Sequence, residues 1–463
     1  MHPSSYSLTC HPIGSLREIW SVSWPLILGL LSMGSMLLID RMFLSYYSLQ
    51  ALNAATNAGT AIFLLLALPT SIAAIAEVFV GKSHGENHFK EASKPVWQMI
   101  WFSLLTTPIV WLIGMILAPL LFFRTGNEIL EYNFFSINLL FTPIFGIEIA
   151  LGSFFIGIGY IKTITIGILL SNILNILLDL IFIFGFGSMI PPMGVVGAGL
   201  ATGISQIFQV IFYILIFLNK ENRQKYNTFK YYFDWPCFKE CLQIGLPAGL
   251  GRFMEIFAHL IFFRIMILAG GDNFTIASIL QSLFIILSCC SEGISQAVKT
   301  IIANLIGGKQ FQSVGKVIRS AFCLHFVFFI IVFITLIILG EQIVSLFFSE
   351  EDSILLTNPS FFSSLQRSYF FMSIFYLFDG FSWVMIGQLT AATDTKFIFY
   401  VSIFTNWLFF VLPVFLIVLF FAGTIVQIWM AMIVYSALNF LIYLLRYFSG
   451  NWLAKAKSIP NPT

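Results

Sequence analysis

Long apolar stretches recur twelve times along this chain of 463 residues. A helix needs about 20 apolar residues to cross the hydrocarbon core of a bilayer. Only 10% of the residues are charged, against roughly 25% in soluble domains. No soluble fold of this length has an interior large enough to bury all of its apolar residues. We therefore predict an all-α polytopic membrane protein with twelve transmembrane helices. The predicted spans are 20–44, 54–81, 96–122, 132–158, 164–186, 193–218, 243–268, 275–306, 318–348, 367–391, 397–420 and 423–447.

Several classes of function find no support in the sequence. The six cysteines have neither zinc-ligand spacing nor a disulfide pattern, and the six histidines form no cluster. A net charge of +2 argues against a nucleic-acid partner, because binding a polyanion needs a concentrated basic surface. The fragment GIGYIKT lacks P-loop spacing, and no HExxH or GxSxG motif is present. We therefore expect neither an enzyme nor a resident cofactor.

Lysine and arginine gather in every second loop. Cytoplasmic loops of membrane proteins retain positive charge, and this pattern places both termini in the cytoplasm. The longest inner loop is also the most basic, and it separates six predicted spans from six. We predict an amino-terminal six-helix bundle at 1–218, a basic cytoplasmic linker at 219–242 and a carboxy-terminal six-helix bundle at 243–463.

The two halves repeat each other. A shift of 222 residues pairs Pro25 with Pro247 and Gly85 with Gly307, without a gap across two predicted helices and their inner loop. Six spans per half give both halves the same orientation, so an axis along the membrane normal should relate these parallel bundles. Chance alignment of apolar segments is the alternative, and the matched prolines and glycines argue against it.

Four polar residues are expected in the outer half of the amino-terminal bundle: Asp40, Asn175, Asp179 and Thr202. An ionisable side chain inside a span costs at least about 2.5 to 3.5 kcal/mol on insertion scales, so each acid is expected to have a functional or structural role that offsets this cost. Asn175 and Asp179 share one helix face, and Thr202 lies on a small-residue face that lets another helix approach closely. The carboxylates could bind a proton, or could bind Na+ with amide and hydroxyl oxygens. The alternative is a structural role, in which hydrogen bonds lock the helices together.

A second pair of acids, Glu255 and Asp379, lies near the middle of two carboxy-terminal spans. Transporters commonly bind ions and substrates at this depth. Arg252 can reach Glu255 along the helix, so an internal ion pair is the alternative. Asp379 has no basic residue within a turn, so it needs a partner from another helix, a proton or a cation.

Glu77 and Lys299 occupy equivalent places in the two repeats, a turn or two from the inner surface. Opposite charges at such positions could meet at the midline when the inner side is shut. We predict that they form part of a cytoplasmic gate; the alternative is that both side chains extend to the lipid headgroups.

The chain resembles the multidrug and toxic compound extrusion (MATE) family nearly end to end. The resemblance rests on Pro25 and Asp40, on the run from Asn175 to Asp179, on the segment PPMGVVGAGLATGISQ, and on the inner-loop pattern VGKSHGENHFKEA echoed by ANLIGGKQFQSV. It implies a role in proton or sodium coupling for Asp40, Asn175, Asp179 and Thr202.

Members of the NorM branch also have a glutamate and an aspartate that match Glu255 and Asp379. The resemblance thus implies a V-shaped antiporter that exports organic, cationic drugs or toxic compounds in exchange for H+ or Na+ by alternating access. We expect a monomer in a bacterial inner membrane, with small organic cations and lipids as its partners. Arg41 and the glycine-free turn SYYSLQ depart from the family pattern.

Two rival functions remain. A lipid-linked precursor flippase of the same wider superfamily is expected to present Arg or Lys to a pyrophosphate, whereas acids dominate here. A membrane-embedded lipid-modifying enzyme would need a catalytic histidine or an acid cluster at the interface, and the sequence has neither.

Overall fold

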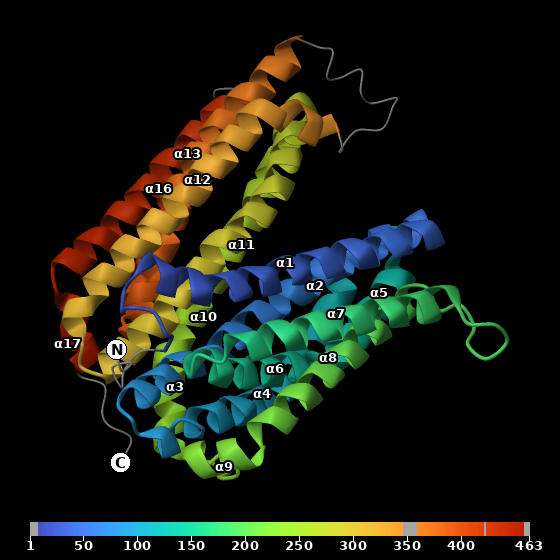
Figure 1. Ribbon diagram of the computed structural model, residues 1–463. Coiled ribbons are helices and arrows are strands. Elements are labelled where there is room, and N and C mark those ends of the chain that lie inside the picture. Colours follow the sequence, from blue (N-terminus) through green and yellow to red (C-terminus); the bar gives the residue numbers. More distant parts are fainter. Residues whose placement is uncertain (1–7, 346–358, 421–422, 458–463) are drawn as a thin grey trace.

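The computed structural model describes residues 8–345, 359–420 and 423–457 (Figure 1). Its regular elements are helices, apart from an isolated bridge between Phe186 and Ile190. The prediction of an all-α fold is therefore confirmed for the described residues. The end of the predicted span 318–348, beyond residue 345, lies outside them.

The first half of the chain folds into one arm and ends in a short surface helix. Its elements are α1 (Leu16–Tyr47), α2 (Leu49–Ala73), α3 (Ala76–Gly85), η1 (Phe89–Glu91), α4 (Lys94–Leu121), α5 (Glu128–Leu140), α6 (Thr142–Gly157), α7 (Ile161–Phe184), α8 (Val195–Phe217) and α9 (Lys220–Tyr226).

The second half forms the other arm. Its elements are α10 (Trp235–Ala269), α11 (Gly271–Gly307), η2 (Phe311–Ser313), α12 (Val314–Ser345), α13 (Pro359–Ala391), α14 (Thr395–Thr405), the π-helical turn η4 (Asn406–Val411), α15 (Leu412–Phe420), α16 (Ile425–Phe448) and α17 (Asn451–Lys457).

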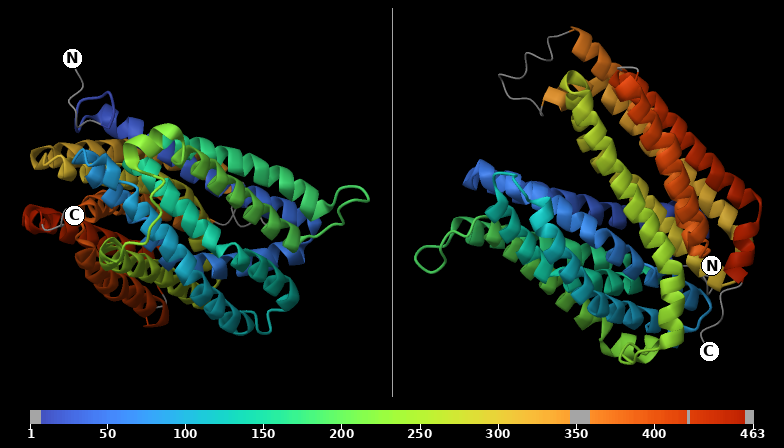
Figure 2. Two further views of the ribbon diagram at one scale, coloured as in Figure 1. Left: turned by 90° about the horizontal axis from the view of Figure 1, so that it is seen from below. Right: turned by 180° about the vertical axis from the view of Figure 1, so that it is seen from behind.

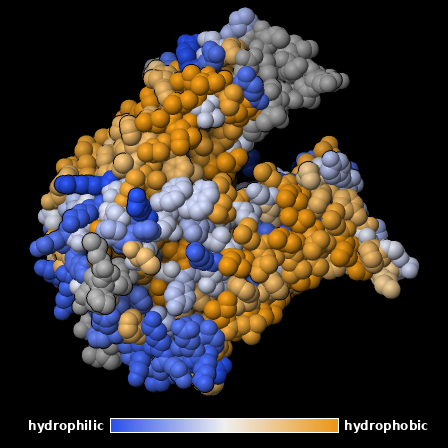
Figure 3. All heavy atoms as spheres, viewed as in Figure 1, coloured by the Kyte–Doolittle hydropathy of each residue, from blue (hydrophilic) through white to orange (hydrophobic). Residues whose placement is uncertain are grey.

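The two arms meet at one end and diverge at the other, so the molecule is V-shaped (Figures 1 and 2). Near the closed end, α1 packs against α11 and α12, α10 packs against α2, and α3 packs against α11. The contacts α1–α11 and α10–α2 are equivalent under the repeat, as expected for parallel halves. The space-filling view shows a cleft between the arms (Figure 3).

The outer surfaces of both arms are apolar, whereas polar residues gather at the closed end (Figure 3). On α4, for example, Leu112, Ile113, Met115 and Ile116 are all exposed. A soluble monomer rarely exposes contiguous apolar surface of this extent. The chain is a multi-pass membrane protein, and its apolar belt faces lipid.

The spans follow the predicted stretches, although several helix boundaries and breaks differ. The predicted span 132–158 consists of two helices, α5 and α6, which meet at a bend of 44° instead of forming one continuous helix. The stretch 54–81 is divided into α2 and α3, and the helix begins earlier, at Leu49. Ser48 explains this start, because it is extended and its hydroxyl accepts a hydrogen bond from the Ala51 N–H, so one residue ends α1 and caps α2.

Ten helices in the described residues are long and apolar enough to cross a membrane, and the bent pair α5–α6 makes eleven. The 35-residue helix α10 is long enough to be the twelfth, although it carries charged residues such as Arg252 and Glu255. Twelve crossings are consistent with this arrangement. The region predicted as a linker contains α9, and α10 begins within it at Trp235.

Candidate functional site

Three of the predicted polar residues come together between α1 and α7. Asp40 is 8% exposed, and Asn175 and Asp179 are fully buried. When the Asn175 amide nitrogen is turned toward the acids, it donates to Asp40 Oδ1 at 2.9 Å and to Asp179 Oδ2 at 3.3 Å. The spacing of four residues on α7 places Asn175 and Asp179 on one face, and α1 supplies Asp40. One amide thus bridges two carboxylates.

The two carboxylates also interact with each other electrostatically beside the Asn175 amide. Two ionised carboxylates that are buried together repel each other, and a proton or a cation bound at the site relieves this repulsion. Asp179 Oδ1 is buried and has no hydrogen-bond partner. Arg41 forms no ion pair shorter than 4.0 Å among the residues described. The site therefore contains a carboxylate oxygen, Asp179 Oδ1, that is available to bind a small cation.

Thr202 is half-buried on α8, and no hydrogen bond within the described chain joins it to these three residues. The small residues of α8 nevertheless permit close packing. A Cβ atom at Gly197 would lie 2.5 Å from the Phe182 carbonyl oxygen of α7, and one at Gly194 would lie 2.6 Å from the Tyr47 ring of α1. Glycine at these two positions thus allows α8 to pack closely against the two helices that carry the acids.

The carboxy-terminal acids form a larger cluster. Arg252 Nη1 lies 3.2 Å from both carboxylate oxygens of Glu255, and Arg252 Nη2 lies 3.9 Å from Glu292 Oε2. Asp379 interacts electrostatically with Arg252 and Glu255 and lies near the Trp383 side chain. Asp379 Oδ2 is buried without a hydrogen-bond partner. The ion pair between Arg252 and Glu255 exists, but three acids around one guanidinium leave an excess of negative charge.

The closed end of the V is held by an ion pair between the halves. Lys299 Nζ of α11 lies 2.8 Å from Glu77 Oε2 of α3, and Glu77 is 1% exposed. Thr300 donates to Glu77 Oε1 at 2.6 Å. Positions 77 and 299 are equivalent under the shift of 222 residues, so the two side chains meet where the two repeats cross. Their role as a gate remains a prediction.

Comparison with known proteins identifies the family. The MatE family profile matches residues 25–181 and 247–416, which cover most of both arms. The chain belongs to the MatE family. It is 25% identical over 431 residues to the probable multidrug resistance protein NorM of Thermotoga maritima, covering 90% of this chain and 89% of that one.

Solved structures share the fold of this MatE chain. A structure of MATE in complex with MaL6 superposes with a TM-score of 0.86 at 17% identity, covering 99% of this chain and all of the other. An outward-facing conformation of a multidrug resistance MATE family transporter of the MOP superfamily gives a TM-score of 0.84 at 16% identity, covering 96% of this chain and 97% of the other.

The MatE chain contains further polar residues that sequence reasoning missed. Glu292 and Trp383 join the carboxy-terminal cluster, and an acid inside the apolar α11 was the available signal for Glu292. In the amino-terminal arm, buried Glu131 accepts hydrogen bonds from Asn57 at 2.7 Å and Thr125 at 2.5 Å. This acid is fully engaged within its own bundle, which distinguishes it from Asp179.

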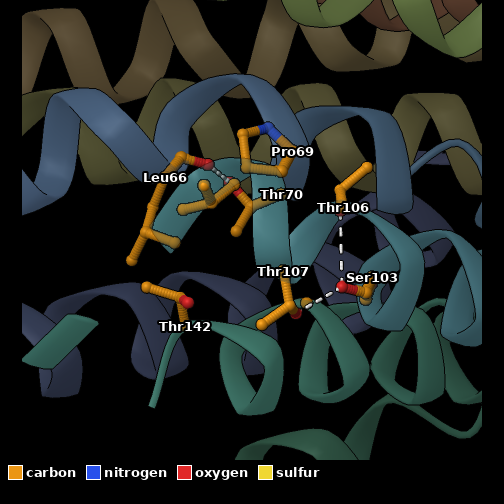
Figure 4. Close-up of a pocket in the computed structure, with 9 residues that line it drawn as sticks. Leu66, Pro69, Thr70, Ser103, Thr106, Thr107 and Thr142 are labelled. Atoms are coloured by element: carbon orange, nitrogen blue, oxygen red, sulfur yellow. Dashed lines mark hydrogen bonds between the residues drawn. The ribbon is translucent and has the colours of Figure 1, made fainter. Parts of the chain in front are cut away.

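A small pocket between α2, α4 and α6 carries several hydroxyl groups (Figure 4). Thr70 donates to the Leu66 carbonyl at 2.6 Å, and Thr107 donates to the Ser103 carbonyl at 2.7 Å. Because these hydroxyl protons are donated to backbone carbonyls of the same helix, the pocket is lined by methyl groups and by the acceptor lone pairs of the hydroxyl oxygens. We assign it to helix packing rather than to ligand binding.

Exchanging the charges of the closed-end pair should separate a gate from a lipid-facing pair. Either Glu77→Lys or Lys299→Glu alone should lower transport roughly tenfold, about 1.4 kcal/mol, because like charges would oppose each other at the crossing. The double exchange should recover most of the loss. The measurement is dye export from cells at equal amounts of protein in the membrane.

The Asp394–Arg446 pair provides a matched control, because it is also 2.8 Å long but lies within the carboxy-terminal arm. Asp394→Ala should lower thermal stability without changing access to the inner side. Unchanged export in both Glu77→Ala and Lys299→Ala would contradict the gate.

Proposed function

We propose that this chain is a cation-coupled antiporter that exports organic, chiefly cationic, compounds by alternating access. The observation that carries the proposal is the pair Asp40 and Asp179, buried together with one carboxylate oxygen free of hydrogen bonds. An acid pair of this kind needs a proton or Na+ to balance its charge, so it is a suitable site for a driving ion. The relationship to probable multidrug resistance proteins supports drug-like cargo.

The coupling follows from linkage. An ion entering from outside must favour one packing of the two arms and weaken substrate binding, because a ligand shifts an equilibrium only by its differential affinity. Neutralising a carboxylate removes a charge with which an organic cation would pair. One proton supplies roughly 1.4 kcal/mol per pH unit and 2.3 kcal/mol per 100 mV. This is enough for about a hundredfold to thousandfold gradient of a neutral solute.

The orientation of the V follows from its charges. Basic residues such as Lys82, Lys220, Arg223 and Lys225 are at the closed end, near α3 and α9 (Figure 1). By the positive-inside rule, this end faces the cytoplasm and the cleft opens outward. Both termini are then cytoplasmic, and the relatedness to bacterial NorM proteins favours an inner membrane.

The flippase alternative requires free cationic groups for a pyrophosphate. Arg252 is paired with Glu255 and faces Glu292, so this cluster would repel an anionic lipid. The observations therefore favour cationic cargo.

The test is ethidium export in a bacterial host that lacks its own efflux pumps. Energised cells carrying the chain should hold several-fold less ethidium than cells with an empty vector. In proteoliposomes, either an imposed pH gradient or an imposed Na+ gradient should drive uptake or release. Export that is independent of both gradients would contradict antiport, and transport of a lipid-linked pyrophosphate instead of ethidium would favour the flippase.

A further inference from the structure

The guanidinium of Arg252 sits in surroundings that would suit an organic cation. Its central carbon lies 5.0 Å from the centre of the Trp383 ring, and its nitrogens contact Glu255 and approach Glu292. An aromatic face flanked by carboxylates is the usual recognition site for delocalised cations. Here, a side chain of the protein itself occupies such a site.

This occupied position is accessible. The side chains of Arg252, Glu255 and Glu292 are 31%, 28% and 41% exposed. α11, which carries Glu292, packs against α1 and α3 of the other arm, and the space-filling view shows a cleft between the two arms (Figure 3). A ligand in the cleft could therefore reach the cluster without unfolding a helix, and a displaced arginine could extend into water.

The charge of the cluster is not balanced by Arg252. Glu255, Glu292 and Asp379 surround a single positive side chain. The Nη2 to Glu292 distance of 3.9 Å is too long for a hydrogen bond, so Glu292 is weakly held. Asp379 Oδ2 has no hydrogen-bond partner. A purely structural ion pair would need only Glu255, whereas this arrangement retains negative charge for a second cation.

We infer that Arg252 is an intramolecular competitor for a site that binds flat, delocalised organic cations on Trp383 between Glu255 and Glu292. The inference rests on the proposed function, because it assigns the cargo class and a specificity residue to the cleft. A cargo cation binds by displacing the guanidinium from the indole face. Only ligands that interact with the carboxylates and the ring better than arginine are then retained, which excludes small, strongly hydrated cations.

Ethidium binding to the purified full-length chain tests this, measured by fluorescence anisotropy at fixed pH without Na+. Arg252→Gln removes the competitor and should tighten binding roughly tenfold. Arg252→Lys keeps the charge but loses the planar stacking and the two-pronged contact, so it should tighten binding about threefold. Adding Glu292→Gln to Arg252→Gln should reverse most of the gain.

Arg264→Gln is the matched control, because it removes an exposed arginine from the same helix and should leave the affinity unchanged. Melting temperature and gel filtration show whether each variant is folded, and Arg252→Lys decides the question if Arg252→Gln does not fold. Equal or weaker ethidium binding by a folded Arg252 variant would overturn the inference, as would absence of binding in both forms.

These results are distinguishable from those that test antiport. Tighter binding in Arg252→Gln without gradient-driven export would support the competitor and contradict the proposed function. Gradient-driven export by the native chain, with no change of affinity in Arg252→Gln, would support the proposed function and overturn the competitor.

Discussion

Asp179→Asn is expected to abolish uphill export while leaving downhill equilibration of the dye intact. The amide cannot become an anion, so the site between α1 and α7 loses the charge that a driving ion must balance. Without ion binding, the gradient contributes none of its roughly 1.4 kcal/mol per pH unit, and accumulation ratios should fall toward one. Asp40→Asn should have a similar effect, because both acids face the same Asn175 amide.

The double variant should be no worse than either single variant, since the two acids act as one site. Proteoliposomes with an imposed pH or Na+ gradient provide the measurement, and ethidium binding checks that the cleft is intact. Glu131→Gln is the control, because this acid is buried in the same arm but satisfied by Asn57 and Thr125. Gradient-driven export by the double variant would remove Asp40 and Asp179 from the coupling mechanism.

The sequence predicted the parts of the fold that depend on composition and period. Apolar length located the helices, and repeated prolines and glycines indicated two parallel halves. Breaks inside the helices were not predictable in this way. The bend between α5 and α6 falls at Phe141, whose ring packs where Gly203 of α8 leaves room. Pro143 in the first turn of α6 is a local signal for a break, but Pro25, Pro69 and Pro108 lie inside continuous helices, so packing against a partner 62 residues away decides where the chain bends.

The candidate site was predictable where one helix face sufficed. Asn175 and Asp179 share a face of α7 by spacing alone, and the structure adds Asp40 from α1. The carboxy-terminal cluster required knowledge of packing, since Glu292 meets Arg252 only because α11 lies beside α10. Their depth in the predicted spans drew attention to Glu255 and Asp379, and the family resemblance agreed, but neither gave a reason to consider Trp383.

Glycines at equivalent positions of the two halves allow α3 and α11 to pack closely at the closed end. A Cβ atom at Gly85 would clash with the carbonyl oxygen of Asn304, and one at Gly307 would clash with the carbonyl oxygen of Lys82. Residues 82 and 304 are themselves equivalent under the shift of 222 residues, so α3 and α11 make the same contact twice. Because the clashing atoms are backbone, a larger residue can be accommodated only if the helices separate.

Gly85→Ala or Gly307→Ala should therefore favour the inward-open state at the expense of the closed one. Overpacking costs typically about 1 to 3 kcal/mol, which shifts a two-state ratio roughly 5- to 150-fold, and export should fall because the outward-facing state is depleted. Maleimide labelling of a single cysteine at buried Ala303, in a chain whose native cysteines are replaced, measures opening of the inner side. Gly34→Ala is the control, because a Cβ there meets no atom within 4 Å. If both inner-end variants label no faster than this control and export normally, the glycine contacts do not determine which side of the V is closed.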